Sequence, residues 1–328
     1  MQLTSVRVVV AVVAGAVLLT GAARAQDRTD WPEGLTLGTA AEDSPYQAYG
    51  SALAALVGET LGIEMAVQPT GGAYQNAALM QTGDLDFGLL AMGPARDAWV
   101  GDSPLTPALP HDQLRALFPM YRTAFHIIST NREEMTSTAA LEGTTVGTGP
   151  AGEASGIYIP RFFDTLEIGV EVRNGHNGDL AEQLEQGLIA ALALADGAPI
   201  DLFAEIAATA DAAIFSFTTE QQATLLDAYP ALVPVTIPEG TYDDQDGEIQ
   251  TVAMWHFAVA RADLPESLVY EITKKVMEHR DWLLEAHPGA AGTDAANIVQ
   301  NSFLPFHPGA VRYYEEIGLE IPEELKAW

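Results

Sequence analysis

The sequence contains no cysteine and few basic residues, and both scarcities restrict what the protein can do. Among 328 residues, Lys and Arg number 15 and Asp and Glu number 45, which gives a formal net charge of −30. Without cysteine the chain has no disulfides, no thiolate metal ligands and no cysteine nucleophile. The strong negative charge repels a phosphate backbone and argues against nucleic acid as a partner.

Long apolar runs are also scarce, and the one at the N-terminus predicts export. Arg7 precedes an apolar run over residues 8–19, and residues 23–25 read A-R-A. This pattern is typical of a secretory signal peptide cleaved after Ala25. The run is shorter than the roughly 20 residues of a spanning helix, which disfavours a retained anchor. We therefore expect a periplasmic protein, and removal of residues 1–25 leaves 13 basic and 45 acidic residues, a balance of −32.

The composition of the remaining chain predicts a folded protein with about two domains. Hydrophobic residues make up 48% of the sequence and charged residues only 18%, which is unlike a disordered acidic segment. Apolar runs alternate with segments of helical spacing, separated by loops rich in small residues. The predicted strands are 35–38, 63–67, 87–90, 125–128, 145–147, 170–172 and 212–215. The predicted helices are 45–61, 73–81, 179–194, 218–228, 265–279 and 309–317, with another through Phe162 and Phe163.

Helix boundaries are marked by local signals. Ser44 stands at an N-cap position with Pro45 after it, and Gly62 and Gly83 follow the last turns of two helices. Thr218 and Gln221 have the spacing of a capping box. Repeated strand–loop–helix units predict doubly wound α/β sheets.

A β-branched and aromatic run at residues 250–260 is placed to cross from one α/β unit back to the other. We expect two lobes, each a doubly wound sheet with flanking helices, and a ligand cleft between them. The first lobe would take residues 26–122, and the second 123–254. Residues 255–328 would return to the first lobe and supply the C-terminal helices.

Motifs of catalysis and metal binding are missing. The seven histidines show no H-E-x-x-H spacing, and the serine in G-E-A-S-G at 152–156 stands one place late for a nucleophile elbow. The acidic turn at 243–248 does not meet the spacing of a calcium loop. We therefore predict no enzyme, no cofactor and no catalytic residue, and the pattern assigns no metal site.

Four segments of the chain resemble the motifs of one protein family. Residues 66–76 (A-V-Q-P-T-G-G-A-Y-Q-N) are similar to its v-x-P-T-G-G-S-x-x-N segment, and residues 117–121 to its a-x-L-Y strand. The loop at 146–152 resembles V-x-x-G-x-x-G. Residues 306–318 (F-H-P-G-A-V-R-Y-Y-E-E-I-G) are similar to P-x-H-P-G-A-x-x-Y-Y-x-E-x-G. The matches are collinear from about Leu35 to Gly318. The chain therefore resembles the TAXI family, the periplasmic solute-binding subunits of TRAP transporters.

This resemblance implies a two-lobed, type II-like periplasmic binding protein. Such a receptor captures a small organic acid or amino-acid-like solute by lobe closure and delivers it to TRAP membrane permease subunits, which are often fused in this family. The alternatives are a sensor-coupled binding protein and a periplasmic enzyme on the same scaffold. The position of loops after strands and the family motifs together nominate the ligand-binding residues. They are Glu42, Asp43, Ser44, Tyr46, Thr70, Gly72, Asn76, Met92, Tyr121, Arg122, Gly152, Glu153 and Ser155.

The sequence departs from the family at three loops that should face the cleft. Glu42 and Asp43 introduce carboxylates into the first of these loops and Glu153 into the last, and Ala91-Met92-Gly93 stands where many members have Q-S-D. Family members commonly bind glutamate or related carboxylates. At about 4 Å and an effective dielectric of about 20, each like-charge contact costs about 4 kcal/mol. The carboxylates could face a ligand amine, hold a bridging metal ion or point to solvent. Glutamate is therefore not expected to be the best ligand.

Basic residues that could pair with a ligand carboxylate are few. The nearest candidates in the sequence are Arg96, Arg122 and Arg161. Arg122 is favoured because it follows the family-matched Tyr121. For each of the three, a surface or interlobe ion pair is the alternative to ligand contact.

Overall fold

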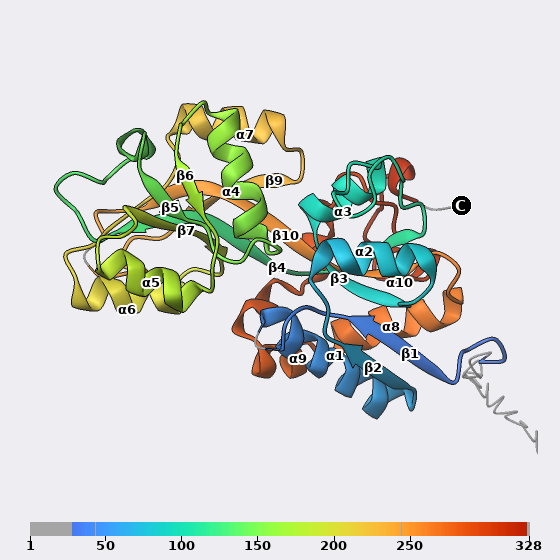
Figure 1. Ribbon diagram of the computed structural model, residues 1–328. Helices are drawn as coiled ribbons and strands as arrows, with labels where there is room; N and C mark the ends of the chain where they lie inside the picture. The colour runs from blue at the N-terminus through green and yellow to red at the C-terminus, as the bar shows by residue number, and fades with distance from the viewer. Residues whose placement is uncertain (1–27, 43, 244, 327–328) are drawn as a thin grey trace, which may run out of the picture.

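The computed structural model describes residues 28–42, 44–243 and 245–326, and it has two α/β lobes side by side (Figure 1). The predicted two-lobed α/β architecture is confirmed. The predicted signal peptide falls on residues 1–25, outside the described part of the chain. Within the described ranges, no helix is both long enough and apolar enough to cross a membrane.

One sheet runs through both lobes, in the order β2-β1-β3-β10-β4-β7-β5-β6, with β8 paired to β4 and β9 to β10. Its strands are β1 (Gly34–Gly38), β2 (Glu64–Gln68), β3 (Phe87–Ala91), β4 (Leu114–Ser129), β5 (Thr145–Gly147), β6 (Glu171–Arg173), β7 (Ala191–Asp196), β8 (Ala213–Phe215), β9 (Leu232–Ile237) and β10 (Ile249–Arg261). The long strands β4 and β10 pair antiparallel and pass from one lobe to the other (Figure 1).

In the first lobe, parallel strands β1, β2 and β3 alternate with helices. Its helices are α1 (Pro45–Leu61), α2 (Ala73–Thr82), α3 (Met92–Val100), α8 (Glu266–Glu278), α9 (Arg280–Ala286) and α10 (Pro308–Glu316), with 3-10 turns η2 (Pro288–Gly292), η3 (Ala295–Gln300) and η4 (Glu323–Leu325). The hydroxyl of Ser44 accepts a hydrogen bond from the N–H of Gln47, as an N-cap does. Gly62 and Gly83 end α1 and α2 in left-handed conformations, so these predicted boundaries are confirmed.

The second lobe contains β5 to β9 together with α4 (Ala154–Thr165), α5 (Asn177–Glu185), α6 (Asp201–Thr209), α7 (Thr219–Ala228) and η1 (Thr138–Leu141). The capping box of Thr218 and Gln221 is present. The helix predicted over 179–194 is wrong in its second half, because α5 ends at Glu185 and β7 begins at Ala191. Gly187 (φ 70°) turns the chain, and the apolar run after it is buried between β4 and β5. Short apolar runs of this kind fit a buried strand as well as a helix.

The two lobes have separate hydrophobic cores. One buried cluster takes its residues from 35–121 and 255–325, whereas two others lie almost wholly within 124–254. The β4–β10 pairing contains a register shift between Trp255 and Phe257, opposite residues 119–122 of β4. A bulge of this kind bends and twists a strand pair. We propose lobe boundaries at this point, after Arg122 on β4 and after Met254 on β10.

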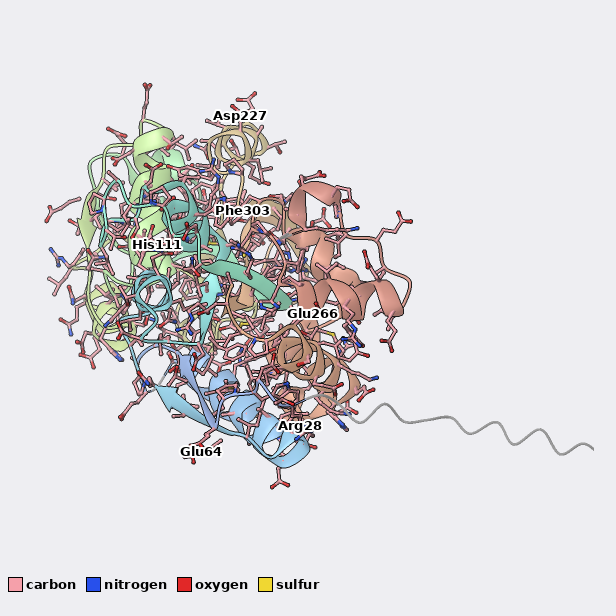
Figure 2. All side chains as sticks on the ribbon, turned by 90° about the vertical axis from the view of Figure 1, so that its right-hand side faces the viewer. Arg28, Glu64, His111, Asp227, Glu266 and Phe303 are labelled. Atoms are coloured by element: carbon pink, nitrogen blue, oxygen red, sulfur yellow. The ribbon has the colours of Figure 1, made fainter. Side chains whose placement is uncertain are left out.

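Acidic side chains are distributed over both lobes. Glu64 on β2, Asp227 on α7 and Glu266 on α8 are all exposed and project from well-separated parts of the surface (Figure 2). Exposed carboxylates of this kind stay in contact with water, and an exposed ion pair such as that of Glu266 with Arg312 (3.6 Å) adds little to stability.

Candidate functional site

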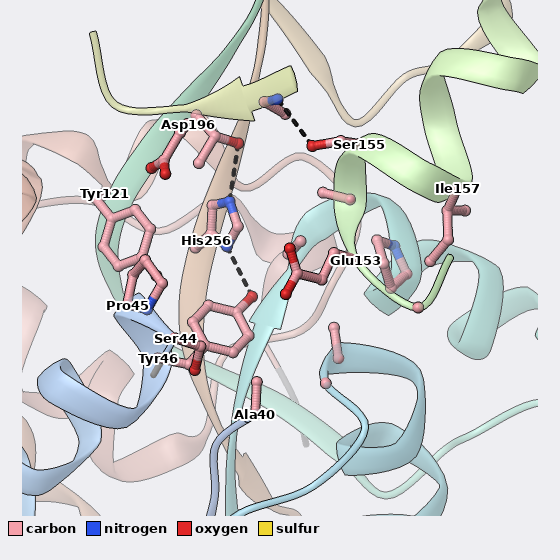
Figure 3. Close-up of a pocket in the computed structure, with 18 residues that line it drawn as sticks. Ala40, Ser44, Pro45, Tyr46, Tyr121, Glu153, Ser155, Ile157, Asp196 and His256 are labelled. Carbon is pink, nitrogen blue, oxygen red and sulfur yellow. Dashed lines mark hydrogen bonds between the residues drawn. The ribbon is translucent and has the colours of Figure 1, made fainter. Parts of the chain in front are cut away.

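A cavity lies between the two lobes, where the crossing strands meet the starts of four helices (Figure 3). This central cavity is lined by Ala40, Ser44, Pro45, Tyr46, Gly72, Ala73, Ala91, Pro94, Tyr121, Thr123, Gly152, Glu153, Ala154, Ser155, Ile157, Ala195, Asp196 and His256. Its volume is about 110 Å³. A single water needs about 10–15 Å³, so the cavity has room for several waters or a small solute.

Helix N-termini make up much of the lining. Residues at the starts of α1, α2 and α3 enter from the first lobe and residues at the start of α4 from the second. The N-cap residues of α2, α3 and α4, which are Gly72, Ala91 and Glu153, make no side-chain capping hydrogen bond. First-turn N–H groups have no partner within their own helix and carry partial positive charge. The starts of α2 and α3 therefore suit a carboxylate or another anionic group, whereas α4 has the carboxylate of Glu153 at its own N-cap.

A buried histidine stands at the back of the central cavity on β10. His256 Nδ1 lies 2.7 Å from the hydroxyl of Tyr46, and Nε2 lies 3.1 Å from the hydroxyl of Thr123. The ring of Tyr121 stacks on the imidazole with 4.8 Å between centroids. Burial lowers the pKa of His256 to about 3, so the ring is neutral at pH 7. These side chains form a fixed aromatic wall that carries no charge.

Two carboxylates face this wall. The side chain of Glu153 projects toward Tyr46 and His256, and Asp196 lies beside Tyr121 (Figure 3). One carboxylate oxygen of Asp196 accepts the N–H of Gly197 at 2.7 Å. Burial raises the pKa of Asp196 and raises the pKa of Tyr46 and Tyr121 strongly. No lysine or arginine lines the cavity among the residues that the structure describes.

Seven of the thirteen predicted ligand-binding residues line the central cavity. They are Ser44, Tyr46, Gly72, Tyr121, Gly152, Glu153 and Ser155. The hydroxyl of Ser155 also accepts the N–H of Ala195 at 2.9 Å, which ties α4 to β7. Asp43 lies outside the described residues.

The other five predicted residues lie elsewhere. Glu42 is exposed and does not line the cavity, and Met92 is buried in the core of the first lobe. Thr70 and Asn76 are hydrogen-bonded to each other and to the backbone behind the cavity wall. Arg122 is exposed and lines a neighbouring cavity on the other side of Tyr121.

Three polar lining residues were not predicted from the sequence: His256, Thr123 and Asp196. His256 and Thr123 lie within the crossing strands, where alternation alone does not show which face meets the cleft. Asp196 is the last residue of β7, directly after the segment predicted to be helical. Recognising 191–196 as a parallel strand would have placed this carboxylate at the cleft, since ligands meet the carboxyl ends of such strands.

An ion pair joins the lobes beside the central cavity. Asp97 on α3 accepts a hydrogen bond at 2.8 Å from the guanidinium of Arg161 on α4. The hydroxyl of Tyr158, also on α4, donates to the same oxygen at 3.2 Å, and Tyr74 on α2 donates to it as well. From the sequence, Arg161 was a candidate either for binding a ligand carboxylate or for an ion pair. In the structure it forms an interlobe ion pair with Asp97.

The buried imidazole predicts a loss of stability in acid. An unfolded chain protonates His256 near pH 6.5, whereas the folded protein does so only near pH 3. Folding therefore loses stability as the pH falls below 6.5, by up to about 1.4 kcal/mol per pH unit for this group. We expect His256 to account for a loss of about 1.5–2 kcal/mol between pH 6.5 and 5.0.

Urea unfolding of the wild type and of His256→Gln at several pH values measures this contribution. The glutamine can still bond to Tyr46 and Thr123 but does not titrate. Its stability should fall less steeply with acid by the stated amount. Parallel pH profiles for the two proteins would show that His256 titrates normally in the folded state.

Comparison with known proteins assigns the chain to a family. Residues 37–318 match the model of the NMT1-like family. The chain belongs to the NMT1-like family. The matched range contains every residue named for the central cavity, from Ala40 to His256.

Several solved structures are similar to this NMT1-like chain. A Xanthomonas citri protein bound to chloride ion matches with a TM-score of 0.50 at 14% identity, over 87% of this chain and 96% of its own. An ancestral arginine-binding protein bound to arginine matches with a TM-score of 0.49 at 15% identity, over 80% and 99%. The periplasmic aliphatic sulphonate binding protein SsuA from Escherichia coli gives 0.45 at 14%, over 90% and 96%. At these identities the likeness concerns the fold alone.

Proposed function

We propose that this protein is an extracytoplasmic solute receptor that captures a small organic acid or amino-acid-like compound. The observation that carries this proposal is the central cavity. Both lobes line it, and both crossing strands contribute residues to its wall. A solute that touches both lobes favours the state in which they are together, so binding and lobe closure are coupled. The bulged middle of β4 and β10 would be the hinge.

We further propose that the receptor serves a TRAP transporter of the TAXI type and delivers its solute to membrane permease subunits. Support comes from the four collinear sequence segments, the last of which begins α10 with the P-G-A run at 308–310. The imidazole of His307 caps this helix by accepting the N–H of Gly309 at 3.2 Å. The side chain of Tyr314 donates to the carbonyl of Leu117 on β4, which gives this segment a structural role rather than one in ligand contact.

Mass spectrometry of small molecules released from the purified protein tests the receptor function. We expect a retained compound, and re-addition of that compound to ligand-free protein should raise the melting temperature and reduce the radius of gyration. If the purified protein retains no compound, and if no member of a panel of amines, carboxylates and amino acids raises its melting temperature, the receptor proposal fails. Conversion of the compound by the protein alone would favour an enzyme instead.

Uptake measurements test the transporter type separately. Proteoliposomes that contain a candidate TRAP permease should accumulate the compound only when the receptor and an ion gradient are both present. Uptake that requires ATP rather than a gradient would exclude a TRAP system and would leave the receptor function intact.

A further inference from the structure

The central cavity has two sides of opposite polarity. The starts of α2 and α3 supply partial positive charge, whereas Glu153 at the start of α4 and Asp196 at the end of β7 supply two carboxylates. The described residues that line the cavity include no lysine and no arginine. Arg161, the nearest basic residue on α4, is bonded to Asp97.

A side cavity extends the negative side. It shares Glu153, Ser155, Ala195 and Asp196 with the central cavity, and it adds Asp201 at the start of α6. The described residues contain no group of three His, Cys, Asp or Glu side chains placed to hold a metal ion. The opposite wall consists of Tyr46 and Tyr121 around a neutral His256, and aromatic faces attract organic cations.

We propose that the solute is an organic cation, with a protonated amine or guanidinium group held by Glu153 and Asp196. This inference rests on the proposed receptor function and specifies the class of solute. A carboxylate of the same molecule, where it has one, would lie at the uncapped helix starts. A second carboxylate has no partner in the cavity, so dicarboxylates such as glutamate should bind weakly.

Isothermal titration on ligand-free protein tests this class of solute. The probes are L-arginine, L-lysine and putrescine as cations, L-glutamine as a neutral amino acid, and L-glutamate and succinate as anions. We expect at least one cation to bind at least tenfold more tightly than L-glutamate. Tightest binding of L-glutamate or succinate, or binding of none of the cations, would overturn the proposed class.

Charge-removing variants locate the contact. Glu153→Gln should weaken binding of the cationic probe at least fivefold, and Asp196→Asn should do the same. Glu42→Gln makes an equal change in net charge in the loop between β1 and α1. Glu42 is exposed and does not line the cavity. It should leave the affinity unchanged. Equal effects of Glu42→Gln and Glu153→Gln would contradict a specific contact and indicate long-range charge alone.

The retained compound separates the two proposals. If the purified protein retains a dicarboxylate, the receptor function stands and the cationic class falls. If it retains an amine or guanidine and Glu153→Gln no longer retains it, both stand. If it retains nothing and no probe binds, both fall.

Discussion

Replacing Asn76 with alanine should lower the free energy of unfolding by about 3–5 kcal/mol. Asn76 is fully buried, and its amide N–H₂ group lies within hydrogen-bond distance of three carbonyl oxygens, at 3.2 Å from Gly38, 2.7 Å from Thr39 and 3.0 Å from Leu89. Its amide oxygen accepts the hydroxyl of Thr70 at 2.7 Å. Alanine would leave these buried groups without partners, and each unsatisfied group costs about 1–3 kcal/mol.

The loss should extend to solute binding, because this amide ties together the loops that carry the cavity. Gly38 is the last residue of β1 and Thr39 begins the loop after it, Thr70 lies in the loop after β2, and Leu89 is on β3. These segments lead into α1, α2 and α3, whose first residues line the central cavity. Loosening the amide therefore displaces three of the four helix starts.

Urea unfolding followed by circular dichroism measures the change, and Gln75→Ala is the matched control. The neighbouring Gln75 also carries an amide, but its side chain is exposed and accepts a single hydrogen bond, from the N–H of Gly71. Gln75→Ala should cost less than about 1 kcal/mol. If the two variants are equally stable, Asn76 does not hold the loops as described.

Asn76 also shows which part of the site the sequence could predict. Its position after the P-T-G-G run placed it correctly at the start of the second helix, and local signals placed Ser44 just before the first helix and Gly72 just before the second. Helix starts are specified by caps, prolines and glycines within a few residues, so a single sequence reveals them. We predicted Asn76 to bind ligand, whereas its amide lies behind the cavity wall. Its partners come from three separate segments, and no local pattern encodes them.

The residues that decide the polarity of the cavity depend on such long-range pairing. Tyr46 and His256 are 210 positions apart and bond because β10 returns to the first lobe beside β3. Asp196 reaches the cleft only because β7 pairs with β4. The crossing run and the strand–helix alternation could be predicted from the sequence. The pairing register of β10 and β7, which decides which side chains face the cavity, could not. Of the three carboxylates singled out from the sequence, Glu153 lines the cavity.

Removing the interlobe ion pair should weaken solute binding about tenfold. Asp97 and Arg161 are on different lobes, and their side chains are 17% and 36% exposed. A hydrogen bond between charged groups contributes about 1.5–3 kcal/mol, and partial exposure reduces this to about 1–2 kcal/mol. If the lobes open about β4 and β10, as we propose, this contribution exists only in the closed state. The apparent affinity then falls with the closed population, by about tenfold for each 1.4 kcal/mol.

Arg161→Gln and Asp97→Asn, singly and together, measure this effect by titration with the solute. Arg261→Gln is the matched control, because Arg261 lies 3.8 Å from Asp86 within the first lobe. It should lower stability without changing affinity. If Arg161→Gln binds the solute as tightly as the wild type does, the pair does not contribute to closure.

The double variant distinguishes a specific effect of the ion pair between Asp97 and Arg161 from general damage to α3 and α4. If the two groups act through each other, the double variant should bind no more weakly than the weaker single variant, which gives a coupling energy of about 1–2 kcal/mol. Additive losses would mean that each side chain acts alone.

The close approach of Gly93 to Tyr158 provides an independent way to disfavour the closed state. A Cβ at Gly93 would lie 2.4 Å from the tyrosine hydroxyl. Gly93→Ala should hold the lobes apart with the ion pair's residues intact, and small-angle scattering with saturating solute should then show a larger radius of gyration than the wild type.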